Sequence, residues 1–242
     1  METPLRIISW NCRVGGFRYK SANVEPLRAD ILAVQEVEPL DNVLVFGGVE
    51  QPTFRNQIKD PAWPRRSIGL FSYTNAKIRA ADATDPVYAF RRFVVKKGFL
   101  EFNVAAVWTW DTGVKATRYM QAHEGVARHR EWMQERPTVI LGDLNMDRRY
   151  KGSALPGLIE MTGELGLVSA YHVFFGEQFG SETRKTYFYH GKDAAAFHLD
   201  YCFIPASWLP FVRQVTVGDH SAWAKVSDHV PLIVDLAIPS PS

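Results

Sequence analysis

Short apolar runs separated by polar and turn-forming residues recur along the whole chain. Runs of this length, rich in Val, Ile, Leu and Phe, are typical of buried β-strands. They predict strands at residues 5–10, 31–35, 68–73, 99–108, 138–142, 198–204 and 231–238. Residues 116–135 have a partly helical spacing, and residues 155–167 form a shorter helical candidate that Gly166 would cap. Because most predicted strands meet without an intervening helix, the pattern favours an α+β fold in which sheets pack on sheets.

The composition fits a folded chain with a large core. Of its 242 residues, 46% are hydrophobic and 22% are charged, which is typical of an ordinary globular protein. No tract rich in Pro, Gly or Ser divides the sequence, and we find no internal repeat. We therefore expect a single domain over residues 1–242, with its core at about 5–238.

Charge, cysteine content and the N-terminal sequence limit the binding partners and the cellular location that we expect. The formal net charge of +2 permits binding to a polyanion without arguing for it, and basic clusters at 65–66, 91–97 and 148–151 either contact phosphates or lie on solvated faces. Cys12 and Cys202 are too few for a disulfide framework or a zinc site, so we expect reduced thiols. We expect no signal peptide, because the first residues lack a basic region followed by a long apolar stretch, and no apolar segment approaches about 20 residues. The sequence thus predicts a cytoplasmic protein without membrane association.

The predicted strand at 138–142 leads directly into Asp143 and Asn145. If the extended geometry persists, the two side chains point to one face and offer a carboxylate and an amide oxygen to a hard cation such as Mg²⁺. The alternative is an Asx turn, in which Asp and Asn side chains bond to their own backbone. Taken alone, this segment favours the turn.

Similar polar residues stand at the ends of other predicted strands. Asn11 and Glu36 follow two of them, Asp200 lies within a third, and Asp228 and His229 precede the last. We expect these side chains to converge at one edge of a packed sheet, where sites are commonly assembled. The metal-ligand candidates are the carboxylates of Glu36, Asp143 and Asp228, the amides of Asn11 and Asn145, and the imidazole of His229. This set suits Mg²⁺ or Mn²⁺ better than zinc.

The order of the motifs SWN, QE, GDLN, LDY and SDH resembles the endonuclease/exonuclease/phosphatase superfamily, which includes exonuclease III, abasic-site endonucleases and deoxyribonuclease I. The resemblance runs from about Ile7 to Leu236. Each motif alone is weak, but the ordered set is highly specific. It implies a four-layer α/β sandwich, in which two mainly antiparallel sheets pack face to face with helices outside.

The resemblance also implies roles for the residues around the metal. Glu36 matches the principal metal-binding glutamate, and Asn11 matches the amide beside the metal and the scissile phosphate. Asp143 and Asn145 match the pair that positions or activates the attacking water and contacts the phosphate. Taken singly, Asn11 could be a strand-end cap, and Glu36 could be a surface acid after a buried strand.

The last two motifs imply a second group of roles. Asp228 lies where the family has a metal-associated aspartate, His229 where it has the phosphate-binding histidine, and Asp200 where an acid orients that histidine. A phosphodiester repels hydroxide until positive charge offsets its own, so a metal and an imidazolium suit this chemistry. Asp200 would hold the imidazole tautomer and favour its protonated form.

Aromatic and basic residues are the candidates for substrate contacts. Phe188 resembles the aromatic segment that lines the abasic-sugar pocket in repair enzymes, although a core aromatic explains it equally well. Trp108 stands where the superfamily usually has a His or Tyr, and an indole cannot transfer a proton at neutral pH. Trp108 and Trp110 would stack on bases or line a pocket, or else be structural. Arg66 is a further candidate.

The predicted function is a divalent-metal-dependent phosphodiester hydrolase that uses Mg²⁺ or Mn²⁺ and direct attack by water. We expect a DNA nuclease with 3′–5′ exonuclease activity, abasic-site endonuclease activity or both, as in DNA repair. The alternatives are an inositol-phosphate or lipid phosphatase or phosphodiesterase of the same superfamily, and a non-catalytic binding protein that kept the fold. We expect nucleic acid as the partner, no protein partner, and a monomer.

Overall fold

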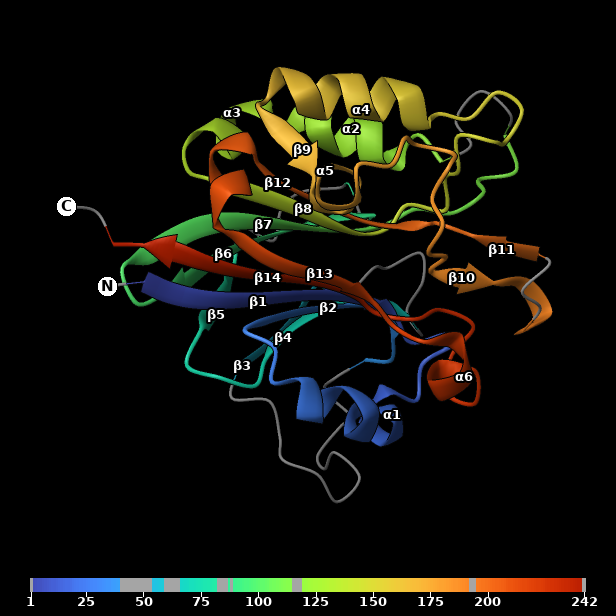
Figure 1. Cartoon of the computed structure of the whole chain (residues 1–242), viewed down its shortest axis with the longest axis horizontal. Helices are drawn as coiled ribbons and strands as arrows, with labels where there is room; N and C mark the ends of the chain where they lie inside the picture. The colour runs from blue at the N-terminus through green and yellow to red at the C-terminus, as the bar shows by residue number, and fades with distance from the viewer. Residues whose placement is uncertain are drawn as a thin grey trace.

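The computed structural model describes residues 2–39, 54–58, 66–81, 87, 89–114, 119–191 and 195–240, with only the backbone for 54–58. Within these residues two six-stranded sheets pack face to face and carry helices on their outer sides (Figure 1). The α+β sandwich expected from the sequence is confirmed. No helix in this part of the chain is both long enough and apolar enough to span a membrane.

Each sheet contains one parallel pair of strands at its centre, β1 with β2 and β7 with β8, and its other pairs are antiparallel. The first sheet has the order β13 (Val212–Val217), β14 (Leu232–Pro239), β1 (Glu2–Asn11), β2 (Ile31–Val37), β4 (Ser67–Ser72) and β3 (Phe54–Ile58). The second has the order β5 (Lys77–Ala80), β6 (Phe90–Lys97), β7 (Leu100–Trp108), β8 (Thr138–Asp143), β12 (Asp200–Pro205) and β9 (Leu167–Ser169).

Helices cover the outer faces of both sheets (Figure 1). α1 (Phe17–Val24) packs on the first sheet, and α2 (Gln121–Arg128), α3 (Arg130–Gln134) and α4 (Leu155–Glu164) pack on the second. A small hairpin, β10 (Tyr187–Phe188) with β11 (Ala196–Phe197), lies at one end. The remaining helices are α5 (Ala170–Phe175), α6 (His220–Trp223) and the 3-10 helices η1 (Glu25–Leu27), η3 (Tyr189–Gly191) and η5 (Ala206–Phe211).

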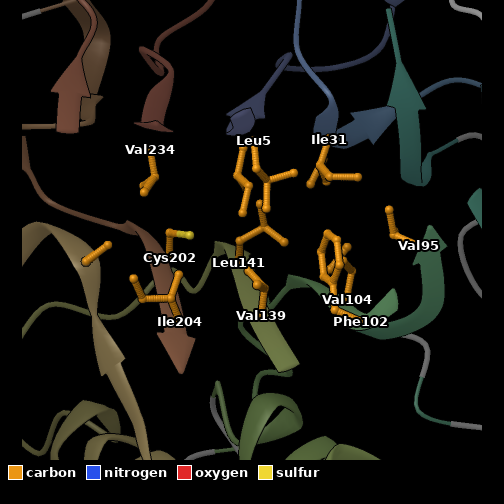
Figure 2. Close-up of a cluster of buried hydrophobic side chains, with 14 of the residues drawn as sticks. Leu5, Ile31, Val95, Phe102, Val104, Val139, Leu141, Cys202, Ile204 and Val234 are labelled. Carbon is orange, nitrogen blue, oxygen red and sulfur yellow. The ribbon is translucent and has the colours of Figure 1, made fainter. Parts of the chain in front are cut away.

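Central strands bury side chains on both of their faces. In β1, Ile7 points into the core between the sheets, whereas Ile8 packs on the side of α1. In β8, Leu141 points into the same central core and Ile140 packs under α2 and α4. Figure 2 shows Leu5 and Leu141 facing each other across this core. A strand buried on both faces has no polar alternation, which is why these segments are continuous apolar runs in the sequence.

The structure confirms the seven predicted strands to within a few residues but corrects the first predicted helix. Residues 116–118 of that predicted helix lie outside the described residues. Most of the rest forms α2 and α3, which are interrupted where His129 leaves the helical conformation with φ −111°. Gly125 lies inside α2, and a Cβ there would be 2.3 Å from the Phe90 ring. Close packing on Phe90 therefore holds α2 despite a residue of low helix propensity.

Two other sequence assignments change in part. The predicted helix 155–167 ends at Glu164, and Gly166 follows it in a left-handed conformation with φ 70°, as expected for a residue that ends a helix. The basic cluster 91–97 is most of strand β6, in which Phe93 and Val95 are fully buried. Arg65, of the first basic cluster, lies outside the described residues.

Gly142 permits the close approach of β8 to β7 just before the candidate site. Its φ is 149°, and a Cβ there would lie 1.8 Å from the carbonyl oxygen of Val107.

We expect Gly142→Ala to lower the free energy of unfolding by about 3 kcal/mol or more, as measured by urea denaturation. Gly163→Ala is the control, because an added Cβ on this exposed position of α4 meets nothing within 4 Å. It should be neutral or stabilise by up to about 1 kcal/mol; equal losses in both variants would contradict the prediction.

Candidate active site

Strand direction brings polar residues from distant parts of the chain to one edge of the sandwich. Asn11, Glu36 and Asp143 lie at the ends of β1, β2 and β8. Asp200 begins β12, which runs antiparallel to β8, so that Asp200 lies directly opposite Asp143. His229 precedes β14, which runs antiparallel to β1. This edge lies at the end of the molecule that carries hairpin β10–β11, away from the two termini (Figure 1).

Asn11 links the two sheets through its side-chain amide. Its Nδ2 donates to Oε1 of Glu36 at 3.2 Å and to Oδ2 of Asp143 at 2.9 Å. Its Oδ1 accepts a hydrogen bond from the backbone N–H of Arg13 at 2.8 Å, and its backbone oxygen accepts from the Ser227 hydroxyl. Because every polar atom of the amide has a partner, Asn11 holds two carboxylates in fixed positions beside each other.

Glu36 occupies a distorted position in β2. Its φ is 59°, and the pairing of β2 with β4 shifts register between Val34 and Val37. Its Oε2 accepts from the backbone N–H of Val14 at 2.8 Å and lies 3.2 Å from Nη1 of Arg66. A left-handed non-glycine residue costs free energy, and such bulges redirect side chains near functional sites. The distortion directs this glutamate toward Asn11.

Asp143 and Asn145 meet through a turn. Asn145 has φ 50°, and its backbone N–H donates to Oδ1 of Asp143 at 2.9 Å. The Asx turn that this segment favoured is therefore present, and extended geometry does not continue to Asn145. The turn nevertheless joins the side chains, since Nδ2 of Asn145 donates to Oδ2 of Asp143 at 2.9 Å and to the Thr109 carbonyl at 2.8 Å. Burial raises the pKa of Asp143, an effect that the nearby His229 partly offsets.

His229 and Asp200 form a buried pair beside these carboxylates. Nδ1 of His229 lies 2.8 Å from Oδ2 of Asp200, and Nε2 lies 3.8 Å from Oδ2 of Asp143. Burial lowers the pKa of His229, but the charges of Asp200 and Asp143 outweigh it and raise the pKa to about 9. At neutral pH the ring is therefore an imidazolium, whose Nδ1–H donates to Asp200.

The donor set fits a hard divalent cation. Asp143, Asp200 and His229 are buried, and their ligand atoms all lie within 4.8 Å of one another. Oδ1 of Asp200 is buried and accepts no hydrogen bond from the residues that the structure describes. Asn11 gathers the Glu36 and Asp143 carboxylates, whose mutual repulsion a cation would relieve. Carboxylate oxygens are the ligands that a hard divalent cation prefers.

The other sequence-predicted site residues lie at the rim or in the core. Asp228 is at the rim, where its Oδ2 lies 3.4 Å from Nε of Arg13. Trp108 is 8% exposed within the central core, and its register partner on β8 is Asp143. Phe188 is 7% exposed and stacks on the His220 ring, with ring centroids 3.8 Å apart. Trp108 and Phe188 thus offer little surface to a substrate.

Tyr187 was not among the predicted site residues, although it lies beside His229. Their ring centroids are 4.8 Å apart, and the two residues form an isolated β-bridge. Burial and the charge of Asp228 raise the pKa of Tyr187 to about 12, so its hydroxyl stays protonated at neutral pH. Neighbouring residues of a strand point to opposite faces, so Tyr187 faces His229 while Phe188 packs on His220. The segment TYFYH places aromatic residues on both faces of the hairpin, so its sequence alone does not indicate which ring faces the site.

Comparison with known protein families matches residues 8–229 to the Endonuclease/Exonuclease/phosphatase family. The match begins within β1 and ends at His229, so it includes every strand end that contributes to the site. The chain belongs to this family. Membership in the Endonuclease/Exonuclease/phosphatase family agrees with the ordered motifs and includes both nucleases and phosphatases in its scope.

Solved structures similar to this family member include two endonucleases. The endonuclease domain of TRAS1, a telomere-specific non-LTR retrotransposon, has 14% sequence identity and a TM-score of 0.69, over 97% of this chain and 98% of that chain. The AP endonuclease LMAP from Leishmania major has 14% identity and a TM-score of 0.71, over 98% of this chain and 88% of that chain. At this identity the likeness establishes the fold. A comparison with curated protein sequences gave no match.

Proposed function

We propose that the chain is a divalent-metal-dependent phosphodiesterase that cuts DNA by direct attack of water. One observation carries this proposal. The two carboxylates that Asn11 bridges, those of Glu36 and Asp143, lie beside the hydrogen-bonded pair of His229 and Asp200. A phosphodiester needs positive charge on its oxygens and a nearby group that accepts the proton of the attacking water. Both kinds of group lie side by side here.

Glu36 and Asp143 are the residues proposed to hold the ion, together with the amide oxygen of Asn145, whose side chain contacts Asp143, and Asp228 at the rim. When bound, Mg²⁺ or Mn²⁺ supplies positive charge that polarises the phosphate and stabilises the departing oxygen. Both amide hydrogens of Asn145 are used, on Asp143 and Thr109, so its carbonyl oxygen is the atom available to a ligand. The Glu36 side chain is 17% exposed, which leaves access from solvent.

The protein groups have complementary tasks in this scheme. Nε2–H of His229 donates to a nonbridging phosphate oxygen, while Asp200 fixes the ring through Nδ1. Asp143 orients the attacking water and accepts its proton, a task that the raised pKa of a buried carboxylate favours. Hydrolysis then proceeds without a covalent intermediate on the protein.

DNA is the proposed substrate, cut at an abasic site or from a 3′ end, as a repair nuclease would cut it. Two observations support it: the similar solved structures are named as endonucleases, and arginines border the site. Arg13 lies beside Asp228 and Arg66 beside Glu36, where each can reach a phosphate that flanks the cut.

The test is cleavage of end-labelled duplex DNA, intact or with one abasic site, in Mg²⁺, Mn²⁺ or EDTA. We expect metal-dependent cutting that Glu36→Gln lowers at least 100-fold, because an amide binds a hard cation far more weakly than a carboxylate. Glu160→Gln, on an exposed position of α4, is the matched control and should cut as the wild type does. The product ladder separates exonuclease from abasic-site incision.

Cutting that persists in EDTA and in Glu36→Gln would refute the metal-dependent scheme. No cutting of either DNA under any metal condition would refute the nuclease assignment. Inositol phosphates and lipid head groups are then the next substrates to test, because the same centre would serve them.

A further inference from the structure

A cavity of about 290 Å³ lies in the loop that follows the GDLN motif. Tyr119, Met146, Tyr150 and Lys151 line it, together with residues 152–154. We call it the post-motif pocket. Its walls combine two phenol rings, a thioether and one ammonium group, the mixture that binds a flat heterocycle with a phosphate attached.

The post-motif pocket is connected to the candidate site by the chain and through hairpin β10–β11. The ring centroids of Tyr187 and His229 are 4.8 Å apart, and Phe197 is the direct partner of Tyr187 across hairpin β10–β11. Residues directly opposite in an antiparallel pair point to the same face. The Phe197 ring lies 5.2 Å from that of Tyr150, which lines the pocket. The pocket is therefore within reach of a nucleotide that flanks the scissile phosphate.

The loop that forms the pocket is held rigidly before any ligand binds. Asp147 is 1% exposed and accepts from the backbone N–H of Arg149 at 2.8 Å and from its Nη2 at 2.7 Å. The same guanidinium donates to the Ala196 carbonyl and lies over the Phe197 ring. These contacts fasten the loop to the hairpin, so binding requires little ordering of the protein.

The loop carries three basic residues, one of which has a structural role while the other two face solvent. Arg149 is committed to Asp147, whereas the exposed Arg148 and Lys151 form no ion pair with any residue that the structure describes. Lys151 lines the pocket and Arg148 lies three positions before it. Unpaired cations beside stacking rings are typical of surfaces that bind single-stranded nucleic acid.

We propose that the post-motif pocket binds one unpaired base of a nucleotide flanking the scissile phosphate, stacked on Tyr150 with Lys151 at the adjoining phosphate. The pocket is at the lower end of the size range of ligand sites and takes one heterocycle rather than a base pair. The inference rests on the proposed nuclease function and adds to it a preference for a strand that is single or locally unpaired.

The test measures binding in EDTA, so that it does not depend on cleavage. A single-stranded oligonucleotide carrying 2-aminopurine is titrated with wild type, Tyr150→Ala, Tyr150→Phe and Lys151→Ala, and the fluorescence quenching by ring stacking is recorded. We expect Tyr150→Ala to weaken binding about 10-fold and to lose the quenching, and Tyr150→Phe to match wild type. Lys151→Ala should weaken binding and lower its dependence on salt.

Tyr19→Ala is the matched control, because Tyr19 is 66% exposed on α1 and does not line the pocket. Equal Kd values for wild type and Tyr150→Ala, or a loss in Tyr150→Phe as large as that in Tyr150→Ala, would overturn the stacking proposal. Retained binding and quenching without cutting would count against the nuclease function alone. Cutting of DNA with unchanged binding by Tyr150→Ala would count against the pocket alone.

Discussion

Replacing Asp143 with asparagine is expected to lower the single-turnover rate of DNA cleavage by about 1000-fold or more. The substitution keeps the shape of a side chain that contacts Asn11 and Asn145 but removes its negative charge. An amide neither accepts a proton from water nor holds a hard cation as a carboxylate does, so a general-base contribution and a metal-binding contribution are both lost. The measurement is cleavage of a labelled duplex with enzyme in excess over DNA.

A measurement of the melting temperature distinguishes a loss of catalysis in Asp143→Asn from misfolding. Asp143 is 1% exposed, and both burial and the neighbouring Asp200 charge disfavour its ionised form. Asp143→Asn should therefore melt near the wild-type temperature, because relief of the buried charge offsets the hydrogen bond from Asn11 or Asn145 that an amide NH2 cannot accept. Asp111→Asn, which alters an exposed acid bonded to the Gly113 backbone, is the control and should leave the rate unchanged. A rate within 10-fold of wild type would remove Asp143 from the proposed chemistry.

The central strands were predictable because their signal is local. The run around Ile7 and that around Leu141 are apolar on both faces, so each is visible in a window of a few residues. Strand β6 was not predicted, because the basic residues beside Phe93 and Val95 hid its apolar alternation. Edge strands such as β5 have few buried side chains and leave a weaker pattern still.

The sequence indicated which residues gather at the candidate site, but it did not indicate the contacts among them. The motifs indicated that Asn11, Glu36 and Asp143 belong together, but the amide bridge joins positions 25 and 132 residues apart. The left-handed backbone of Glu36 depends on the pairing of β2 with β4, and no local sequence rule indicates it. Tyr187 was missed for a related reason, since a two-residue strand gives too short an alternation to fix which side chain faces the site.

The second large effect concerns the pair formed by Asp200 and His229. Asp200→Asn should lower kcat/KM by about 100- to 10,000-fold, because the ring loses the carboxylate that orients it and stabilises its charge. The pKa of His229 is raised to about 9, so wild type keeps the imidazolium below that pH and loses it above. Without Asp200 the pKa falls, and the basic limb of the pH–rate profile should move to lower pH.

A pH profile from pH 6 to 10 for wild type, Asp200→Asn and His229→Asn separates positioning from mere structural support. The folded-state pKa of His229 lies above its unfolded value near 6.5, so the stability that the pair contributes is fully present below pH 6.5 and is lost as pH rises through 9. His229→Asn removes the titrating group, so its residual activity should have no limb near pH 9. A variant that combines Asp200→Asn with His229→Asn should cut little more slowly than either single variant, because the two residues act as one unit. A parallel drop at all pH values in Asp200→Asn, with the basic limb still near pH 9, would mean that Asp200 supports the fold and does not hold the charge of His229.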